Sequence, residues 1–383
     1  MSEELESDKA VEIVVKLCLD RATRAFPARA SVGFLFMATK PGMSEYERKA
    51  WDALLDAAIS PERSGRLEGL SQGIKQRAQQ VAAQARLTVE QLPGATAVIG
   101  TLDDLTTKAM ETLHTVLVER GLNSVKPGNV FAMFADEGVV VASYDEVRQL
   151  DLQQCDRSVP RRKERYIALA VAGGAASSLA VTGSVVTSAV TGGTSMTVAA
   201  SAVVADVTAV MVGMGRIVAL VAAHYGYDVR EPGEQAFGSG VIAYSAAGSP
   251  AEKAAALASL SRLTERMMRQ ASWRHLQPQQ ADNVIQQISV ALGFRMAKHK
   301  LAQAVPVLGA VVNGGLNARI AQRTFERAQQ AYRLRFLTEK HDLDARQWAP
   351  AVDWGGAIDV PLVDEVLGAE LDSECGDTQG VTD

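Results

Sequence analysis

The sequence has few aromatic residues, few cysteines and none of the common catalytic motifs. Aromatic residues make up 5% of the 383 residues, whereas hydrophobic residues make up 47%. The core must therefore consist mainly of Ala, Val and Leu, which favours closely packed helices. Cys18, Cys155 and Cys375 lie far apart and form no CxxC pair. This spacing excludes a disulfide framework and favours a reducing compartment.

No motif that would identify a catalytic or cofactor site is present. The sequence contains no GxxxxGK[ST] loop, no GxSxG and no HExxH. Gly213 and Gly215 are followed by Val218 where a dinucleotide-binding fingerprint has its third glycine. The five histidines have no paired metal-ligand spacing. We therefore assign no catalytic, cofactor-binding or metal-binding residue.

Alternating apolar and polar residues, the pattern of strands, are also scarce. Only Val139–Val141 could form a short strand, and no partner strand is evident nearby. Helical spacing of apolar residues recurs instead, over residues 9–26, 64–91 and 280–300. These patterns predict an all-α protein.

Helix ends are also marked in the sequence. Ser44 with Glu47, and Ser249 with Glu252, have the spacing of capping boxes at helix starts. His224-Tyr225-Gly226 predicts the C-terminal end of a helix. Gly226 would take the left-handed position, and His224 would lie near the negative end of the helix dipole.

Charge divides the chain into unequal parts. From Ala349 to the end there are nine acidic residues and no Lys or Arg, whereas the whole chain has a net charge of −5. We expect an N-terminal helical extension (1–40), a helical domain (41–345) and an acidic, disordered C-terminal tail (346–383). The acidic first residues do not resemble a signal peptide, and the net charge argues against nucleic-acid binding.

The centre of the chain lacks charge altogether. Residues 166–205 contain no charged side chain, and Gly, Ala, Ser and Thr supply 27 of these 40 residues. Such a composition packs helices closely but drives membrane insertion poorly. We expect a Gly/Ala/Ser/Thr-rich helical hairpin over about 166–225. Three alternatives remain open: a hairpin buried in a soluble bundle, a hairpin that inserts into or lies against a membrane conditionally, and a permanent transmembrane pair.

Two basic elements lie on either side of this hairpin in the sequence, and they are candidate contacts to anionic lipid. The first comprises Arg161, Arg162, Lys163 and Arg165, and the second is the row Arg319, Arg323 and Arg327. Basic residues beside an apolar segment attract anionic headgroups by about 1 kcal/mol each near the surface. The alternatives are a solvated helix start for the first and a solvated or salt-bridged row for the second.

Four polar residues on or just beyond the second hairpin arm are candidates for a buried polar or ligand site: Asp206, Arg216, His224 and Asp228. Asp206 and His224 lie on one helix face but about 27 Å apart, so each needs a partner from elsewhere. Because buried charges are usually paired, we expect Asp206 to meet Arg216 or an arginine among residues 319–327.

Four stretches resemble the EcsC family, which is named for a bacterial protein encoded beside an ABC transporter. They are SEYERKAWDALLD (44–56), SYDEVRQLDLQQCDRSVPRRKERY (143–166), AAHYGYD (222–228) and VPVLGAVVNGGLNARIAQRTFERAQQAYRLRFL (305–337). The second contains Leu150-Asp151-Leu152 and a following Asp156. The resemblance covers about 44–340. It implies a helical fold in a membrane-associated or transporter-linked setting, and it implies no catalytic residue.

We therefore expect a non-enzymatic, cytoplasmic protein on the inner face of the cell membrane. Its partner would be an anionic membrane surface or a membrane transport complex. One alternative is an enzyme that acts on a lipid or apolar substrate in the hairpin pocket. The other is a soluble interaction scaffold without membrane contact.

Overall fold

The computed structural model describes residues 42–59, 113–159, 194–269, 277–303, 309–349 and 357–377. The chain divides into two units, Met1–Met43 and Ser44–Asp383, and every described helix lies in the second. All regular structure in the described part is helical, with no strand, so the all-α prediction is confirmed. Val139–Val141 has irregular backbone between two helices, and Val140 is 90% exposed, so the possible short strand does not form there.

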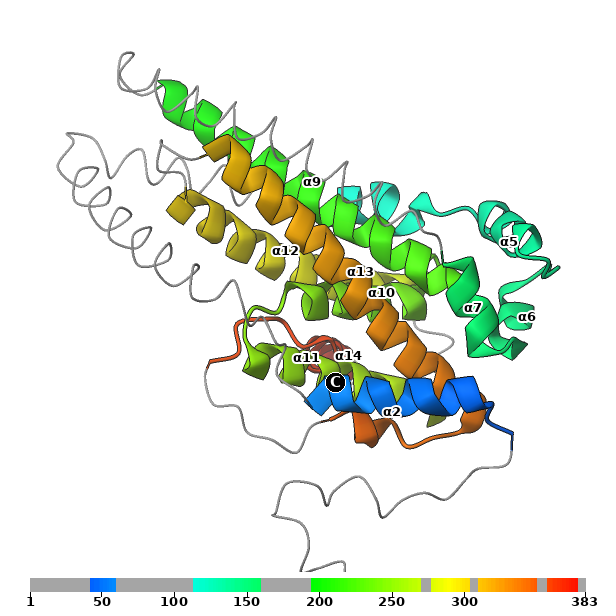
Figure 1. Ribbon diagram of the computed structural model, residues 1–383. Coiled ribbons are helices and arrows are strands. Elements are labelled where there is room, and N and C mark those ends of the chain that lie inside the picture. Colours follow the sequence, from blue (N-terminus) through cyan, green and yellow to red (C-terminus); the bar gives the residue numbers. More distant parts are fainter. Residues whose placement is uncertain are drawn as a thin grey trace, which may run out of the picture. The chain divides into compact units, whose positions relative to one another are not determined.

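The helices differ widely in length (Figure 1). The long ones are α9 (Thr194–His224), α11 (Pro250–Arg269), α12 (Pro278–Gln303) and α13 (Gly309–His341). The shorter ones are α2 (Glu45–Ile59), α5 (Pro127–Asp136), α6 (Tyr144–Gln149), α7 (Leu152–Ser158), α10 (Pro232–Ala246) and α14 (Val363–Asp377), with two 3-10 turns, η1 (Leu122–Ser124) and η3 (Ala345–Trp348).

Helix α10 lies at the centre and contacts α9, α11, α12, α13 and α14. Its sequence carries one charge, Glu234, in the first turn, and every residue from Gln235 to Ser245 is buried. Gly240 allows α14 to approach closely, because a Cβ there would come within 2.6 Å of Val363. Small residues on this helix therefore set the spacing of the core.

Both capping boxes form as the sequence predicts. At the start of α2 the backbone N–H of Glu47 donates to Ser44 Oγ at 3.1 Å, and that of Ser44 donates to Glu47 Oε2 at 3.2 Å. At the start of α11 the same reciprocal pair joins Ser249 and Glu252 at 3.1 and 3.2 Å. Such boxes satisfy backbone donors that have no partner within the helix.

The C-terminal segment differs from the predicted disordered tail. Trp348 is fully buried and donates through Nε1 to Thr338 Oγ1 at 3.1 Å. Val363 and Leu367 of α14 are also buried, and α14 packs against α10, α11 and α12. The prediction of disorder rested on the acidic composition and did not weigh the apolar residues of α14. One of the acidic residues also has a basic partner: Asp364 accepts a hydrogen bond from Arg262 Nε at 2.5 Å.

Candidate functional site

Helix α9 has two halves with different surroundings. From Met214 to His224 almost every side chain is buried, the exception being Arg216. Between residues 204 and 213 the helix instead shows exposed Ala205 and Ala209 and half-buried Val204 and Val212. In the described part of the chain, α9 is the one helix long and apolar enough to cross a membrane, over Val204–His224. A buried core helix meets the same criterion, and the second half of α9 is of that kind.

The buried end of α9 terminates as predicted. Gly226 has φ +84°, the left-handed conformation that favours glycine. The N–H of Tyr227 donates to the carbonyl of Ala222 at 3.0 Å, and that of Gly226 donates to Ala223 at 3.2 Å. This pair of bonds is a Schellman motif. It turns the chain so that Tyr225 and Tyr227 are both buried in the core.

His224 does not carry the charge that its place at the helix end suggested. Its side chain is fully buried, and burial lowers its pKa to about 4. Nδ1 lies 3.0 Å from Ser158 Oγ on α7, and the imidazole ring lies 5.8 Å from that of Phe134 on α5. Nε2 is buried and has no hydrogen-bond partner among the described residues. At neutral pH His224 is therefore an uncharged core residue that joins α9 to α7.

Three members of the predicted polar set have different neighbours. His224 contacts Ser158, as described above. Arg216 is exposed and donates through Nε to the carbonyl of Arg120 at 2.7 Å. Asp228 pairs with Arg230 just beyond the helix end. Asp206 is buried, with 6% of its surface exposed, and its expected arginine partner stays a prediction. These residues are spread from position 206 on α9 to position 228 just beyond its end and do not form one catalytic cluster.

The basic row on α13 is not a single exposed face. Arg319 is exposed and Arg323 is half-buried, but Arg327 is 4% exposed. Arg327 Nη1 donates to the carbonyls of Tyr244 and Ala247 at 2.6 and 2.7 Å, and its guanidinium faces the Tyr244 ring. The expectation that Arg327 contacts lipid is therefore wrong, because this arginine binds carbonyls at the C-terminal end of α10.

Several expected elements lie outside the described residues. They are the basic cluster Arg161, Arg162, Lys163 and Arg165, the first hairpin arm with its glycines (Gly173, Gly174, Gly183, Gly192 and Gly193), and the predicted helices over 9–26 and 64–91. The hairpin as a whole and its packing stay predictions.

Comparison with known proteins agrees with three of the four stretches that carry the resemblance, those over 143–166, 222–228 and 305–337. The model of the EcsC protein family matches residues 61–337, which is most of the chain. This chain belongs to the EcsC family. No curated protein and no solved structure matches it. The matched range begins after the 44–56 stretch, so that part of the resemblance lies outside the family match.

The EcsC-like stretches meet in space at Asp156. Its carboxylate accepts hydrogen bonds from Tyr225 Oη at 2.6 Å, from Tyr46 Oη at 2.7 Å and from Arg333 Nη2 at 2.9 Å. These donors come from α2, from the end of α9 and from α13. Asp151, earlier in the same stretch, forms a capping box with Gln154 at the start of α7. The acidic residues of this stretch thus join four elements of the fold.

A second carboxylate on α2, that of Glu47, is almost fully buried. It accepts from Lys340 Nζ at 2.7 Å and from the backbone N–H of Leu152 at 3.2 Å, and it contacts His341 Nε2 at 3.0 Å. Burial acts to raise the pKa of Glu47, but the hydrogen bonds from Lys340 and from the backbone of Ser44 and Leu152 lower it overall. The site clamps α2 to α7 and α13.

A charge cluster around the buried Arg335 was not predicted from the sequence. Arg335 on α13 is 3% exposed; its guanidinium donates to both oxygens of Glu234 at 2.6 and 2.7 Å and to Glu339 at 2.6 Å. It lies 4.1 Å from the centre of the Tyr227 ring and 4.4 Å from that of Phe237. Arg335 and Glu339 are an i,i+4 pair, a signal present in the sequence, whereas Glu234 is 101 residues away.

Proposed function

We propose that this EcsC-family protein is non-enzymatic and associates peripherally with the cytoplasmic face of a membrane, alone or with a membrane transport complex. The observation that carries the proposal is the segment of α9 over residues 204–210, whose exposed and half-buried side chains are Ala, Val and Thr. In the sequence this segment begins at the end of the long stretch without charged residues. Such a surface favours contact with lipid or with an apolar partner.

Burial of the other half of α9 supports peripheral contact over complete insertion. Met214, Ile217, Val218, Leu220 and Val221 are all at most 5% exposed. Each contributes about 1.5–3 kcal/mol through burial. Removing this half from the core would therefore cost on the order of 10 kcal/mol, which favours a helix anchored in the domain at one end.

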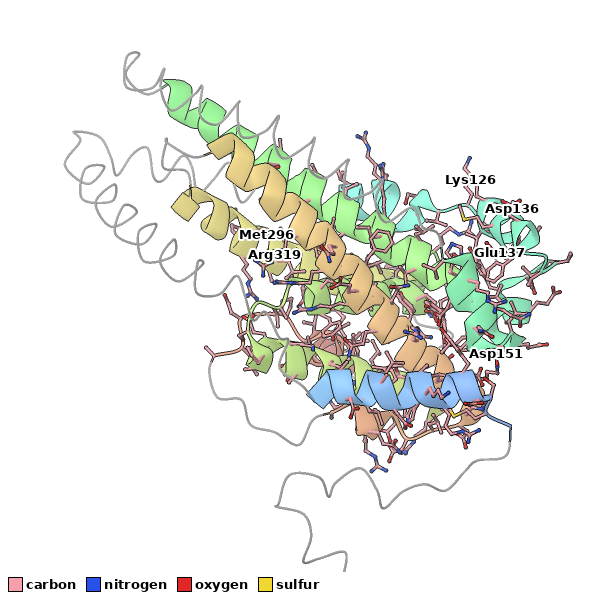
Figure 2. All side chains as sticks on the ribbon, in the orientation of Figure 1. Lys126, Asp136, Glu137, Asp151, Met296 and Arg319 are labelled. Atoms are coloured by element: carbon pink, nitrogen blue, oxygen red, sulfur yellow. The ribbon has the colours of Figure 1, made fainter. Side chains whose placement is uncertain are left out.

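Basic residues near the start of α13 support an anionic surface as the partner. The first turns of α9 and α13 and the last turn of α12 lie at the same end of the bundle (Figure 1). Arg319 is exposed and lies in the first half of α13 (Figure 2). The last turns of α12 carry Lys298 and Lys300 in their sequence. Each basic residue near an anionic membrane adds about 1 kcal/mol of attraction.

Vesicle flotation with charged substitutions on α9 tests the proposal. Ala209→Asp places a carboxylate on the exposed apolar segment, whereas Ala53→Asp makes the same change on an exposed position of α2. We expect the wild-type protein and Ala53→Asp to float with vesicles that contain phosphatidylglycerol, and Ala209→Asp to bind several-fold less. Equal flotation of all three proteins, or flotation of none, would contradict the proposal.

A soluble interaction scaffold is the second candidate function. The burial of Arg327 and of the second half of α9 favours it, because both features serve packing within the domain. Failure of the vesicle experiment with a correctly folded protein would leave this candidate first.

A further inference from the structure

A cavity of about 390 Å³ lies between the start of α10, the end of α11 and the last turns of α13. Its volume is within the range of small-molecule sites. The walls include Glu231 and Pro232 before and in the first turn of α10, Met267 and Met268 of α11, and Glu339 of α13. None of the four predicted polar residues lines the cavity, although Asp228 lies near Glu231 at its rim.

Arg335 lines the cavity, but its charge is already neutralised within the protein. Glu234 and Glu339 both bind its guanidinium, so one buried cation faces two carboxylates. Arg148, the other arginine in the wall, donates to the carbonyl of Gly226 at 2.7 Å and pairs with Asp145. Both guanidinium groups are therefore already engaged by acceptors within the protein, and Arg148 also acts on Glu231.

Glu231 adds a negative charge at the rim. Its side chain makes no capping bond to α10, although it occupies the N-cap position. Partial burial raises the pKa of Glu231, and the nearby carboxylates Glu234 and Asp228 raise it further. Arg148 lowers this pKa in part. The lining carries three carboxylates against two arginines, so the arginines offset the negative charge of the cavity only in part.

The remaining lining residues have a different character. Met267 and Met268 are half-buried and supply polarizable, adaptable apolar surface, and Pro232 adds a rigid apolar face. A ligand that suits both kinds of lining residue carries a positive centre for the carboxylates and methyl or methylene groups for the thioethers.

We propose that this cavity binds a small organic cation, a primary amine or a quaternary ammonium group, with its charge facing Glu231 and Glu339 and its apolar part against Met267 and Met268. The cavity has room for about a dozen heavy atoms, since a water molecule in the liquid occupies about 30 Å³. The ammonium group could belong to a free metabolite or to a lipid headgroup, and both sources present the same chemistry.

Titration of the full chain with choline chloride, and separately with ethylammonium chloride, tests the proposal. Binding is followed by saturation-transfer NMR, with sodium chloride at equal ionic strength as the reference. We expect saturable binding of at least one probe. Glu231→Gln should weaken it at least threefold, whereas Glu119→Gln, the same change at an exposed residue outside the cavity wall, should leave it unchanged.

Met268→Lys provides a second variant, because it places a tethered ammonium group in the cavity. We expect it to abolish probe binding while the protein stays folded by circular dichroism. No saturable binding to the wild type, or equal binding by the wild type, Glu231→Gln and Met268→Lys, would overturn the proposal. Competition by phosphatidylcholine vesicles but not by phosphatidylglycerol vesicles would assign the ammonium group to a lipid headgroup; no competition by either would assign it to a free metabolite.

Discussion

Arg333 Nη2 lies 2.9 Å from Asp156 Oδ2, and the two residues are 177 positions apart in the sequence. Both side chains are largely enclosed, with 25% and 15% of their surfaces exposed. The same carboxylate binds Tyr46 and Tyr225. One acidic side chain thus links α2, α7, α13 and the end of α9, which is a structural reason for its place in the EcsC-like stretch.

Replacing Asp156 should destabilise the whole domain. In Asp156→Ala the Tyr225 hydroxyl and the Arg333 guanidinium lose their acceptor, and we expect the free energy of unfolding to fall by about 2–4 kcal/mol. Urea denaturation followed by circular dichroism measures this loss. Glu45→Ala removes a carboxylate from an ion pair whose two members are both more than three-quarters exposed, and it should change stability little. Equal effects of the two substitutions would show that the Asp156 cluster does not hold the helices together.

The packed C-terminal helix gives a second prediction with a neighbouring control. Leu367 is fully buried, and Leu367→Ala should cost about 2–5 kcal/mol through lost burial and a residual cavity. Gly368 is the next residue, and a Cβ there would meet nothing within 4 Å. Gly368→Ala should therefore leave the melting temperature unchanged or raise it slightly. An unchanged melting temperature for Leu367→Ala would mean that α14 is not part of the folded domain in solution.

The sequence allowed the fold class and several local features to be predicted, because these depend on nearby residues. The two capping boxes and the turn at Gly226 are determined by residues within a few positions of each other. The Glu234–Arg335 pair and the burial of Arg327 depend on which helices lie side by side. One sequence contains no direct signal for such contacts. The packing of α14 could not be predicted for the same reason. Val363 and Leu367 are buried, and α14 packs against helices that are distant in the sequence.

The buried imidazole of His224 predicts a specific pH dependence of stability. Burial lowers its pKa to about 4 in the folded protein, whereas the unfolded value is about 6.5. The folded state therefore binds fewer protons than the unfolded state between these values. The stabilisation is present above about pH 6.5 and is lost as the pH falls toward 4, by up to about 3 kcal/mol.

Comparison of variants isolates this effect from the titration of carboxylates. His224→Gln should lose less stability than the wild type between pH 6.5 and 4.5, even if it is less stable at pH 7. Denaturation midpoints at four pH values suffice, and parallel curves for the wild type and His224→Gln would refute the assignment.

The two ends of the α13 arginine row should respond to substitution in opposite ways. Arg327→Ala leaves the carbonyls of Tyr244 and Ala247 without their buried donor. We expect a loss of about 2–4 kcal/mol in stability, with no selective loss of vesicle binding by the protein that remains folded. Arg319→Glu changes an exposed charge, so its stability should be near that of the wild type. Its binding to anionic vesicles should fall severalfold, and that difference should shrink as salt screens exposed charges.

Arg48→Glu on α2 makes the same change of charge at another exposed position. It should leave vesicle binding at the wild-type level, because α2 is held against α7, α11 and α13 and not at the end of the bundle where α9 begins. Melting temperatures and flotation at low and high salt can be measured on the same three preparations. If Arg319→Glu and Arg48→Glu weaken binding equally, the attraction depends on net charge alone and the surface near the start of α13 has no special part in it.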